Sequence, residues 1–257
     1  MSRRPRILLT NDDGIHAEGL GAVAEALAGF ADVVVVAPDR EQSACGHALS
    51  LDRPLRMVEM RPGRFAVDGT PTDCVNLAVH WVLREDPVDL VVSGINHGLN
   101  LGDDVTYSGT VSAALEAHLL GLPAVAFSQQ IGDETSFARS ARVSAALLHA
   151  LLDHGVSPRM LLNVNLPATP SAGVRLTRLA RRVYEQVVVE RGDPRGRRYF
   201  WIGGEPRWEE GPDCDHAAVS AGLVSITPLR LDLTDYEGLD AHAEVIAALG
   251  RAVGDGG

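Results

Sequence analysis

The sequence contains no lysine. All 23 of its basic residues are arginine, and they stand against 34 acidic residues, which gives a formal net charge of −11. Without lysine the chain can form neither a P-loop lysine contact nor a lysine Schiff base. The surplus of negative charge argues against nucleic-acid polymers and anionic membranes as partners, because both attract positive surfaces. A small phosphorylated ligand therefore needs a local source of positive charge, because the net charge of the protein is negative.

Cysteines and long apolar runs are also scarce in the 257 residues. The three cysteines, Cys45, Cys74 and Cys214, are too few and too scattered for a disulfide scaffold or a zinc cluster, which favours reduced thiols in the cytoplasm. The first apolar run ends at Asn11, too early for a signal peptide. No later run approaches the roughly 18 apolar residues of a membrane-spanning helix. We therefore expect a soluble, cytoplasmic protein without a membrane partner.

What the sequence does contain is a regular alternation of apolar strands and helical segments. All-apolar segments such as Val33–Ala37 are typical of parallel strands buried on both faces. Strands separated by helices indicate βαβ units, with helices on both faces of the sheet. We therefore predict a doubly wound α/β core. Its expected strands are Arg6–Thr10, Val33–Ala37, Val88–Val92, Ala124–Phe127 and Leu161–Val164, and its expected helices are Ala17–Phe30, Thr72–Arg84, Gly109–Leu120 and Ser136–His154.

The rhythm changes after about Pro170. Residues 174–190 and 198–202 predict antiparallel strands around a glycine-rich turn, and a final strand at 223–226 precedes a helix at 241–253. We expect one domain over residues 1–257, with a catalytic core at 1–170 and a β-hairpin arm and C-terminal helix at 171–257. Exposed hairpin edges are usually paired or covered. The arm therefore predicts a homodimer or a homotetramer.

Two motifs with oxygen ligands follow the first two predicted strands. In Thr10–Gly14 (TNDDG), Asp12 and Asp13 are adjacent carboxylates, an arrangement that a hard cation between them makes tolerable. The alternative is a turn that caps the next helix. Residues 39–50 (DREQSACGHALS) place Ser43 and His47 in a loop at the same sheet edge, where the alternative is a solvated loop.

Two further motifs complete the candidate site. In residues 93–102 (SGINHGLNLG), the glycines allow close backbone approach and Asn96 offers a neutral oxygen to a hard cation, although the glycines alone would also suit a turn. In residues 107–112 (YSGTVS), a helix start with two hydroxyls can hold phosphate without lysine, or can be a simple N-cap.

The segment Asp68–Cys74 (DGTPTDC) favours a structural role. Thr70 as N-cap, Pro71 at the first helical position and Asp73 at the third explain the motif as a self-sufficient helix start. The other motifs follow strands whose carboxyl ends meet at one edge of a parallel sheet. Together they describe a site for Mg²⁺ or Mn²⁺ and a phosphate group, since two carboxylates with neutral oxygens suit hard cations rather than zinc.

These motifs, together with residues 37–47 (APDREQSACGH), 93–117 (SGINHGLNLGDDVTYSGTVSAALEA) and 225–236 (SITPLRLDLTDY), resemble the SurE (survival protein E) nucleotidases in order along nearly the whole chain. The resemblance implies a Rossmann-like three-layer α/β/α core with a mostly parallel sheet and a C-terminal arm used in assembly. It implies a divalent-metal-dependent phosphatase acting on nucleoside 5′- and 3′-monophosphates, with exopolyphosphatase activity in some members.

Carried over by motif, the resemblance assigns one divalent metal ion per subunit, Mg²⁺ or Mn²⁺, to four ligands: Asp12, Asp13, Ser43 and Asn96. It places four more residues beside the bound phosphate: Asn11, Ser108, Gly109 and Thr110. We hypothesise hydrolysis of a phosphomonoester by metal-activated water, with Asp12 or Asp13 as the catalytic group that orients this water. His47 and His97 are candidate general acids, although solvated loop histidines are the preferred interpretation of both.

Two rival interpretations stay open. A haloacid-dehalogenase-type phosphatase needs two aspartates two positions apart and a charge-balancing lysine, which this sequence does not have. A nucleotide-binding regulatory module without turnover is the alternative from another class. Against it, no G-x-G-x-x-G motif follows the first strand, and Asp12 and Asp13 would repel a pyrophosphate in the absence of a cation.

Overall fold

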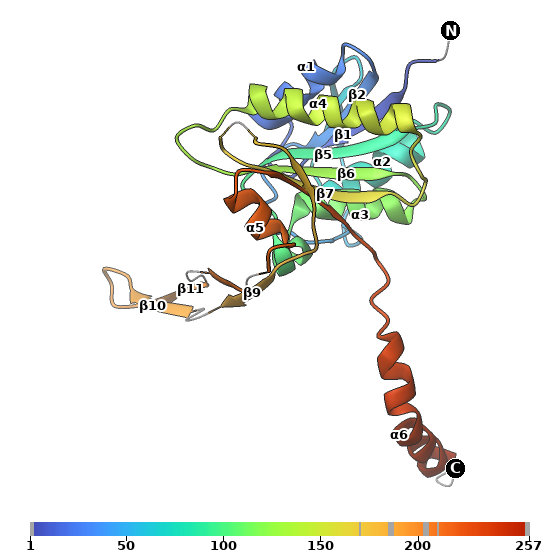
Figure 1. Ribbon diagram of the computed structural model, residues 1–257, viewed down its shortest axis with the longest axis vertical. Coiled ribbons are helices and arrows are strands. Elements are labelled where there is room, and N and C mark those ends of the chain that lie inside the picture. The colour runs from blue at the N-terminus through green and yellow to red at the C-terminus, as the bar shows by residue number, and fades with distance from the viewer. Residues whose placement is uncertain (1–2, 170, 185–187, 203–205, 210, 255–257) are drawn as a thin grey trace.

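A nine-stranded sheet lies between two layers of helices (Figure 1). The computed structural model describes residues 3–169, 171–184, 188–202, 206–209 and 211–254. The strand order is β3-β4-β2-β1-β5-β6-β7-β13-β8, and all neighbours from β4 to β7 are parallel. The predicted three-layer α/β/α core with a mostly parallel sheet is therefore confirmed. The strands are β1 (Arg6–Thr10), β2 (Asp32–Pro38), β3 (Met57–Arg61), β4 (Arg64–Val67), β5 (Leu90–His97), β6 (Ala124–Gln129), β7 (Leu161–Leu166), β8 (Val174–Leu176) and β13 (Val224–Pro228).

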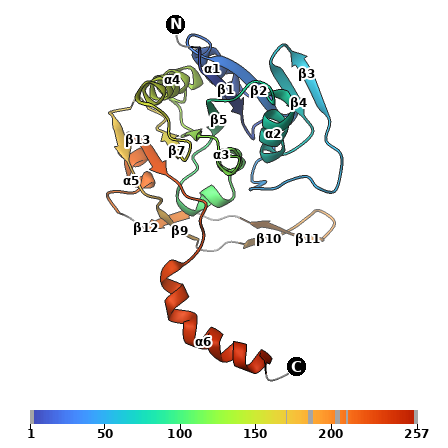
Figure 2. The same cartoon turned by 90° about the vertical axis from the view of Figure 1, so that its right-hand side faces the viewer.

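Helices cover both faces of this sheet, as Figure 2 shows from the side. On one face α1 (Glu18–Leu27) packs against α4 (Phe137–His154), and on the other α2 (Pro71–Leu77) packs against α3 (Gly109–Leu119). Successive strand side chains point to opposite faces. Within β1, Leu9 accordingly joins the apolar cluster under α1 and α4, and Leu8 joins the cluster under α2 and α3. The central strands are rich in apolar residues because both of their faces are buried.

The helix starts follow the capping chemistry of the sequence. At α2, the Thr70 hydroxyl accepts a hydrogen bond from the Asp73 backbone at 3.1 Å, and the Asp73 carboxylate accepts one from the Thr70 backbone at 2.9 Å. This reciprocal capping box satisfies two amide groups that would otherwise be unpaired. Ser108 caps α3 in the simpler way, by accepting from the Val111 backbone at 3.1 Å. The predicted structural role of Asp68–Cys74 is confirmed. Past α2, the chain continues as a short π-helix, η1 (Ala78–Val82).

The connections around β1 lead to strands on both of its sides. The chain leaves β1 through α1 to reach β2 on one side, while β5 pairs with β1 on the other side. The carboxyl ends of β1 and β5 therefore lie at a topological switch point, where ligands bind in open α/β sheets. A 3₁₀ helix, η2 (Gly102–Thr106), connects the loop after β5 to α3.

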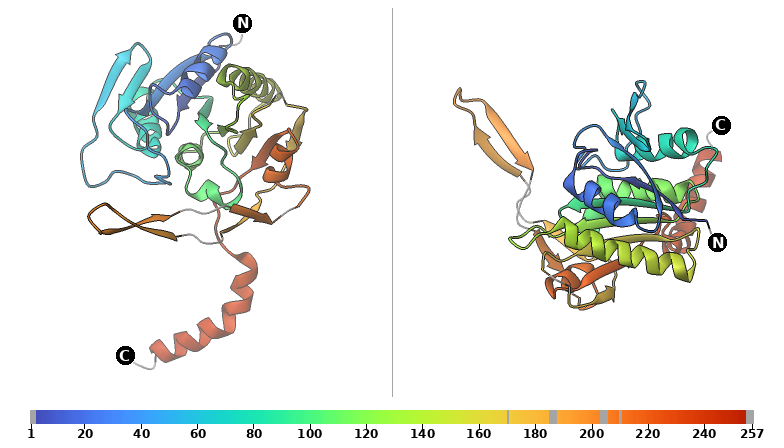
Figure 3. Two further views of the ribbon diagram at one scale, coloured as in Figure 1. Left: turned by 90° about the vertical axis from the view of Figure 1, so that its left-hand side faces the viewer. Right: turned by 90° about the horizontal axis from the view of Figure 1, so that it is seen from above.

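The chain after residue 170 divides between the sheet and a projecting arm. Strands β8 and β13 join the main sheet beside α5 (Asp215–Ser220). Strands β9 (Arg181–Tyr184) and β12 (Pro206–Glu209) pair with each other, and β10 (Val188–Gly192) and β11 (Arg198–Ile202) form the predicted antiparallel hairpin. The hairpin and α6 (Tyr236–Gly254) extend away from the body of the molecule (Figure 3). The functional division at residue 170 stays a prediction.

Among the described residues, no helix combines the length and the apolar character needed to cross a membrane. The three cysteines are free thiols, and two of them, Cys74 and Cys214, are buried.

Candidate metal and phosphate site

Asp12, directly after β1, lies against the first turn of α3. Its side chain accepts a hydrogen bond from the Thr110 hydroxyl, and only 4% of the residue is exposed. Gly109 makes this approach feasible, because a Cβ at position 109 would lie only 2.7 Å from the Cβ of Asp12. The packing therefore joins one predicted metal ligand to the predicted phosphate-binding turn.

Burial raises the pKa of Asp12 to about 6. The hydrogen bond from Thr110 lowers that pKa, and the negative charge of Asp13 raises it further. The pKa of Asp13 is also raised, first by burial, while the backbone hydrogen bond and charge of His97 lower it and Glu41 raises it. Two adjacent carboxylates that are costly to ionise form a natural site for a cation, because an opposite charge favours their ionised form.

The end of β5 supplies the amide ligand. The Asn96 side chain donates from Nδ2 to the Gly98 carbonyl at 2.9 Å, which leaves its carbonyl oxygen, Oδ1, as the atom suited to a hard cation. The next residue, His97, donates its backbone N–H to Asp13 at 3.1 Å. The β5 register shifts just before Asn96, where Gly94 has a φ of +119°. The loop after β1 and the end of β5 are thereby held together.

Ser43 lies in the loop that follows β2. The adjacent Gln42 donates its backbone N–H to the Asp12 carbonyl at 2.8 Å, so this part of the loop lies beside the aspartate pair. Ser43 itself is exposed, and its hydroxyl donates to Glu41 Oε1 at 2.7 Å. The sequence interpretation missed Glu41, whose charge also acts on Asp13. The available signal was a carboxylate two positions before a proposed ligand.

The N-terminus of α3 is capped by a side chain and also has backbone N–H groups that suit an anion. Ser108 provides the cap, and the first amides of the helix, at Gly109 and Thr110, have no intrahelical acceptor. Such N–H groups and the helix dipole favour a phosphate. Asn11 is fully buried and donates to the Gly14 carbonyl at 3.0 Å, while its Oδ1 has no hydrogen-bond partner among the described residues. Its contact with phosphate stays a prediction.

His47 is an exposed residue of its loop, and its imidazole ring also has a partner in the body of the protein. Its Nε2 lies 2.6 Å from Oε2 of Glu116, a buried carboxylate on α3, and its side chain is 28% exposed. Sequence reasoning missed Glu116, because 69 positions separate it from His47. His97 is exposed, as expected, with its ring packed against Phe137 at a centroid distance of 5.9 Å.

The donor set fits a hard cation. Among the residues that the structure describes, no three histidine, cysteine or acidic side chains gather as a metal cluster. The predicted ligands instead combine two carboxylates with one hydroxyl and one amide. Oxygen donors of this kind suit Mg²⁺ or Mn²⁺. Burial is the main cause of the raised pKa of both aspartates, and a bound cation would favour their ionised form.

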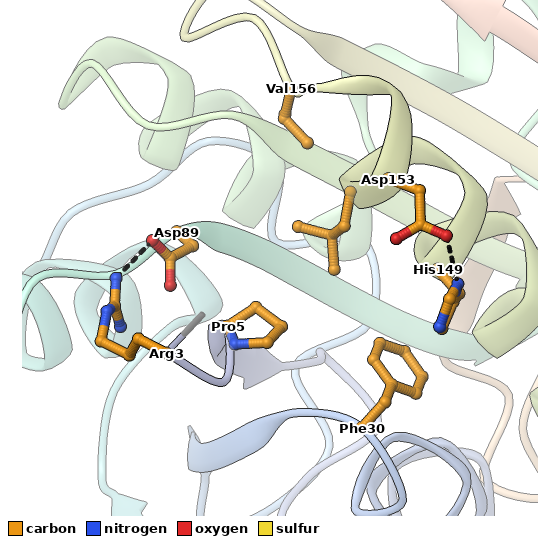
Figure 4. Close-up of a pocket in the computed structure, with 8 residues that line it drawn as sticks. Arg3, Pro5, Phe30, Asp89, His149, Asp153 and Val156 are labelled. Carbon is orange, nitrogen blue, oxygen red and sulfur yellow. Dashed lines mark hydrogen bonds and ion pairs between the residues drawn. The ribbon is translucent and has the colours of Figure 1, made fainter. Parts of the chain in front are cut away.

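A separate cavity of about 440 Å³ lies at the opposite end of the sheet, near the start of β1 and β5 (Figure 4). None of the predicted site residues lines it. Its ionisable groups pair with one another, since Arg3 binds Asp89 at 2.7 Å and His149 binds Asp153 at 2.9 Å. A cavity whose charges are already compensated is a weaker candidate for catalysis than the aspartate pair. It is lined by Arg3, Pro5, Phe30, Asp89, His149, Leu152, Asp153 and Val156.

Comparison with known proteins finds the same family by sequence and by structure. Residues 7–186 match the family model for survival protein SurE. A 5′-nucleotidase SurE of Syntrophotalea carbinolica is 52% identical over 240 residues, covering 91% of this chain and 94% of its own length. That of Geobacter metallireducens is 53% identical over 239 residues, with the same coverage. The crystal structure of a SurE protein from Aquifex aeolicus superposes with a TM-score of 0.85 at 41% identity, covering 94% of this chain and 99% of that one.

Proposed function

The chain belongs to the survival protein SurE family, and from this premise we propose that it is a divalent-metal-dependent phosphomonoesterase that hydrolyses nucleoside monophosphates to nucleoside and phosphate. The observation that carries the proposal is the contact between Asp12 and the first turn of α3, made by Thr110 and allowed by Gly109. It joins a carboxylate pair suited to a cation with a helix terminus suited to phosphate, which are the two requirements of metal-assisted phosphoryl chemistry.

Each group of residues has a distinct task in this proposal. Asp12, Asp13, Ser43 and Asn96 hold one Mg²⁺ or Mn²⁺ ion per subunit. When bound, such an ion neutralises phosphate charge and lowers the pKa of a water molecule.

The chain supplies the remaining functions through its own groups. The amides of Gly109 and Thr110, with Ser108 and Asn11 beside them, bind the phosphate oxygens and stabilise their charge as the ester bond breaks. A carboxylate oxygen of Asp12 or Asp13 that does not face the cation orients the attacking water. The acidic surface does not oppose this binding, because the local positive charge comes from the cation and from the helix terminus.

The names of the relatives favour nucleoside 5′-monophosphates as substrates. We extend the proposal to 3′-nucleotidase and exopolyphosphatase side activities, because the site selects a terminal phosphate through main-chain and cation contacts. We also place the protein in the cytoplasm, in keeping with three free thiols. Neither nucleic-acid polymers nor membranes are expected partners at a net charge of −11.

We further propose that the chain assembles as a homodimer or homotetramer. Large apolar side chains of the hairpin are exposed, among them Phe200 at 56% and Trp201 at 64%. On α6, Ile246 is 62% exposed and Leu249 is 55% exposed. Apolar surface gathered on projecting elements is typical of protein interfaces. Light scattering across a wide concentration range tests the proposal, and a monomer throughout would contradict it.

Phosphate release from a panel of nucleoside 5′- and 3′-monophosphates, with Mg²⁺, Mn²⁺ or EDTA, tests the enzymatic function. We expect release with at least one cation and none with EDTA. Nucleotide binding without release under every condition would favour the regulatory module instead. Release that continues undiminished in EDTA would contradict the metal requirement.

A further inference from the structure

Glu116 is a buried carboxylate that the proposed reaction does not use. Only 6% of this residue is exposed, yet both of its oxygens have partners from other segments. Oε2 lies 2.6 Å from His47 Nε2, and Oε1 accepts a hydrogen bond from Asn76 Nδ2 at 2.6 Å. A carboxylate is costly to bury unless it is hydrogen-bonded. We therefore ask which role the Glu116 carboxylate has between α2 and α3.

The partner that distinguishes this network is His47, because it lies in the same loop as Ser43. Ser43 is flanked by two contacts with the body of the protein. On one side Gln42 donates its backbone N–H to the Asp12 carbonyl at 2.8 Å. On the other side Gly46 donates its backbone N–H to the Tyr107 carbonyl at 3.2 Å, immediately before the α3 cap. The loop therefore bridges the aspartate pair and the phosphate-binding turn.

The side chain of Ser43 makes no such contact with the core. It is exposed and donates to Glu41, which is an exposed residue of the same loop. The position of the Ser43 hydroxyl consequently depends on how the loop backbone is fixed on either side of it. His47 provides the side-chain anchor from this loop to α3, the helix whose first turn forms the phosphate-binding site.

The capping box of α2 holds the following part of the loop. The Thr70 hydroxyl donates to the Ala48 carbonyl at 2.7 Å, and Asp73 Oδ1 accepts from the Ser50 backbone at 2.9 Å. Asn76, which donates to Glu116, lies on the same helix, and α2 packs beside α3 (Figure 2). The loop is thus attached to both helices of this layer, with the His47–Glu116 contact at its centre.

We propose that His47, Glu116 and Asn76 are positioning residues that fix the loop, and with it the Ser43 hydroxyl, relative to Asp12 and Asp13. They act on cation affinity through Ser43, rather than by touching the substrate or transferring a proton. The proposal rests on the proposed function to the extent that Ser43 is taken as a cation ligand. Partners that orient metal ligands change metal affinity by about 10–100-fold when they are removed.

Mn²⁺ binding to the full-length protein, measured by isothermal titration calorimetry, tests this proposal without relying on turnover. We expect Ser43→Ala and His47→Ala each to weaken Mn²⁺ binding by about tenfold. The double variant should bind Mn²⁺ no more weakly than Ser43→Ala alone, because His47 acts through Ser43. Effects that multiply in the double variant would overturn the proposal.

Conservative variants separate positioning from proton transfer. His47→Gln retains a side-chain N–H that can reach Glu116 but cannot exchange a proton in the physiological range, so it should keep Mn²⁺ affinity within about threefold of the wild type. If His47→Gln binds Mn²⁺ as weakly as His47→Ala, the positioning role is wrong. Glu116→Gln keeps the size of the side chain and should weaken Mn²⁺ binding less than His47→Ala does. If His47→Ala does not fold, the Mn²⁺ affinity of Glu116→Gln tests the positioning role in its place.

Two controls keep the outcomes distinct. Leu119→Ala changes an exposed residue of the same helix and should leave Mn²⁺ affinity unchanged. Hydrogen exchange should show faster exchange at residues 42–46 in His47→Ala, with the rest of the sheet unaffected. If Ser43→Ala alone binds Mn²⁺ normally, the metal assignment in the proposed function is wrong. If Ser43→Ala binds weakly while His47→Ala binds normally, only the positioning role is overturned.

Discussion

The sheet edge around Asp12 and the projecting arm differ in the kind of surface that they present. The first gathers polar groups, and the second exposes apolar side chains. At the sheet edge, polar and charged groups of the loop after β1, of β5 and of α3 are bonded to one another, and Asp12 and Thr110 are buried. In the hairpin, every residue of β10 and β11 is exposed, including Trp201 and Ile202. The second region exposes apolar surface, which we propose another copy of the chain covers. We therefore expect variants in one region to leave the function of the other unchanged.

The largest expected effect is on activity at the sheet edge. Asp13→Asn should reduce metal-dependent phosphate release by roughly three orders of magnitude, because it removes a charged cation ligand. Assembly should be unchanged by light scattering, since the arm lies elsewhere. Near-wild-type turnover in this variant would show that Asp13 is not a metal ligand, and a changed oligomeric state would break the separation of the two regions.

The next effect concerns the cost of keeping Asp12 ionised. The folded protein binds the Asp12 proton more tightly than the unfolded chain, since the pKa rises from 3.8 to about 6 on folding. Stability of the cation-free protein should therefore fall as pH rises through that window. A tenfold change in proton affinity corresponds to about 1.4 kcal/mol, so Asp12→Asn should stabilise the cation-free protein at pH 7 by up to roughly 3 kcal/mol.

Urea unfolding at pH 4 and pH 7 measures this effect. The gain from Asp12→Asn should be larger at pH 7, and Mn²⁺ should stabilise the wild type but not the variant. Asp52→Asn, at an exposed position, provides the control. Equal stability of Asp12→Asn and the wild type at both pH values would contradict the buried, charge-deficient site.

A substitution in the arm tests whether assembly can change while the metal site does not. Trp201→Glu should weaken assembly by about 2 kcal/mol or more, as expected for an aromatic interface residue, and should shift the protein to a smaller species in light scattering. Mn²⁺ affinity per chain should remain at the wild-type value. Arg191→Gln, on the paired strand β10, changes the charge by the same single unit and is the matched control. Loss of Mn²⁺ binding in Trp201→Glu would mean that assembly completes the site.

The smallest expected effect is at the helix cap. Ser108→Ala removes the hydrogen bond to the Val111 backbone and should cost about 1 kcal/mol of stability. Because the hydroxyl also borders the phosphate-binding turn, KM for the nucleotide should rise while Mn²⁺ affinity stays constant. An unchanged KM would restrict Ser108 to capping.

The parts that could be predicted from sequence are those set by local patterns. Apolar periodicity identified the strands and helices, and Thr70 with Asp73 indicated their capping box through a spacing of three residues. The contact between Asp12 and Thr110 joins positions 98 apart, so no local pattern contains it. The contact between His47 and Glu116 joins positions 69 apart, so the sequence around His47 does not reveal it.

The arm was predictable only in outline. Its glycine-rich turn indicated a hairpin, and β10 and β11 confirm it. Strand β13 joins the main sheet by pairing with β7, and β8 joins it by pairing with β13. These are long-range choices among strands of similar composition. Strand order of this kind follows from packing rather than from residue preference.

The most direct test of the central claim is a crystal structure of the full-length protein grown with Mn²⁺ and inorganic phosphate, with Mn²⁺ located by anomalous scattering. We predict an anomalous peak within coordination distance of Asp12, Asp13, Ser43 and Asn96, with phosphate between that peak and the amides of Gly109 and Thr110. A peak that is absent there and present beside Asp89 and Asp153, in the cavity of Figure 4, would contradict the account.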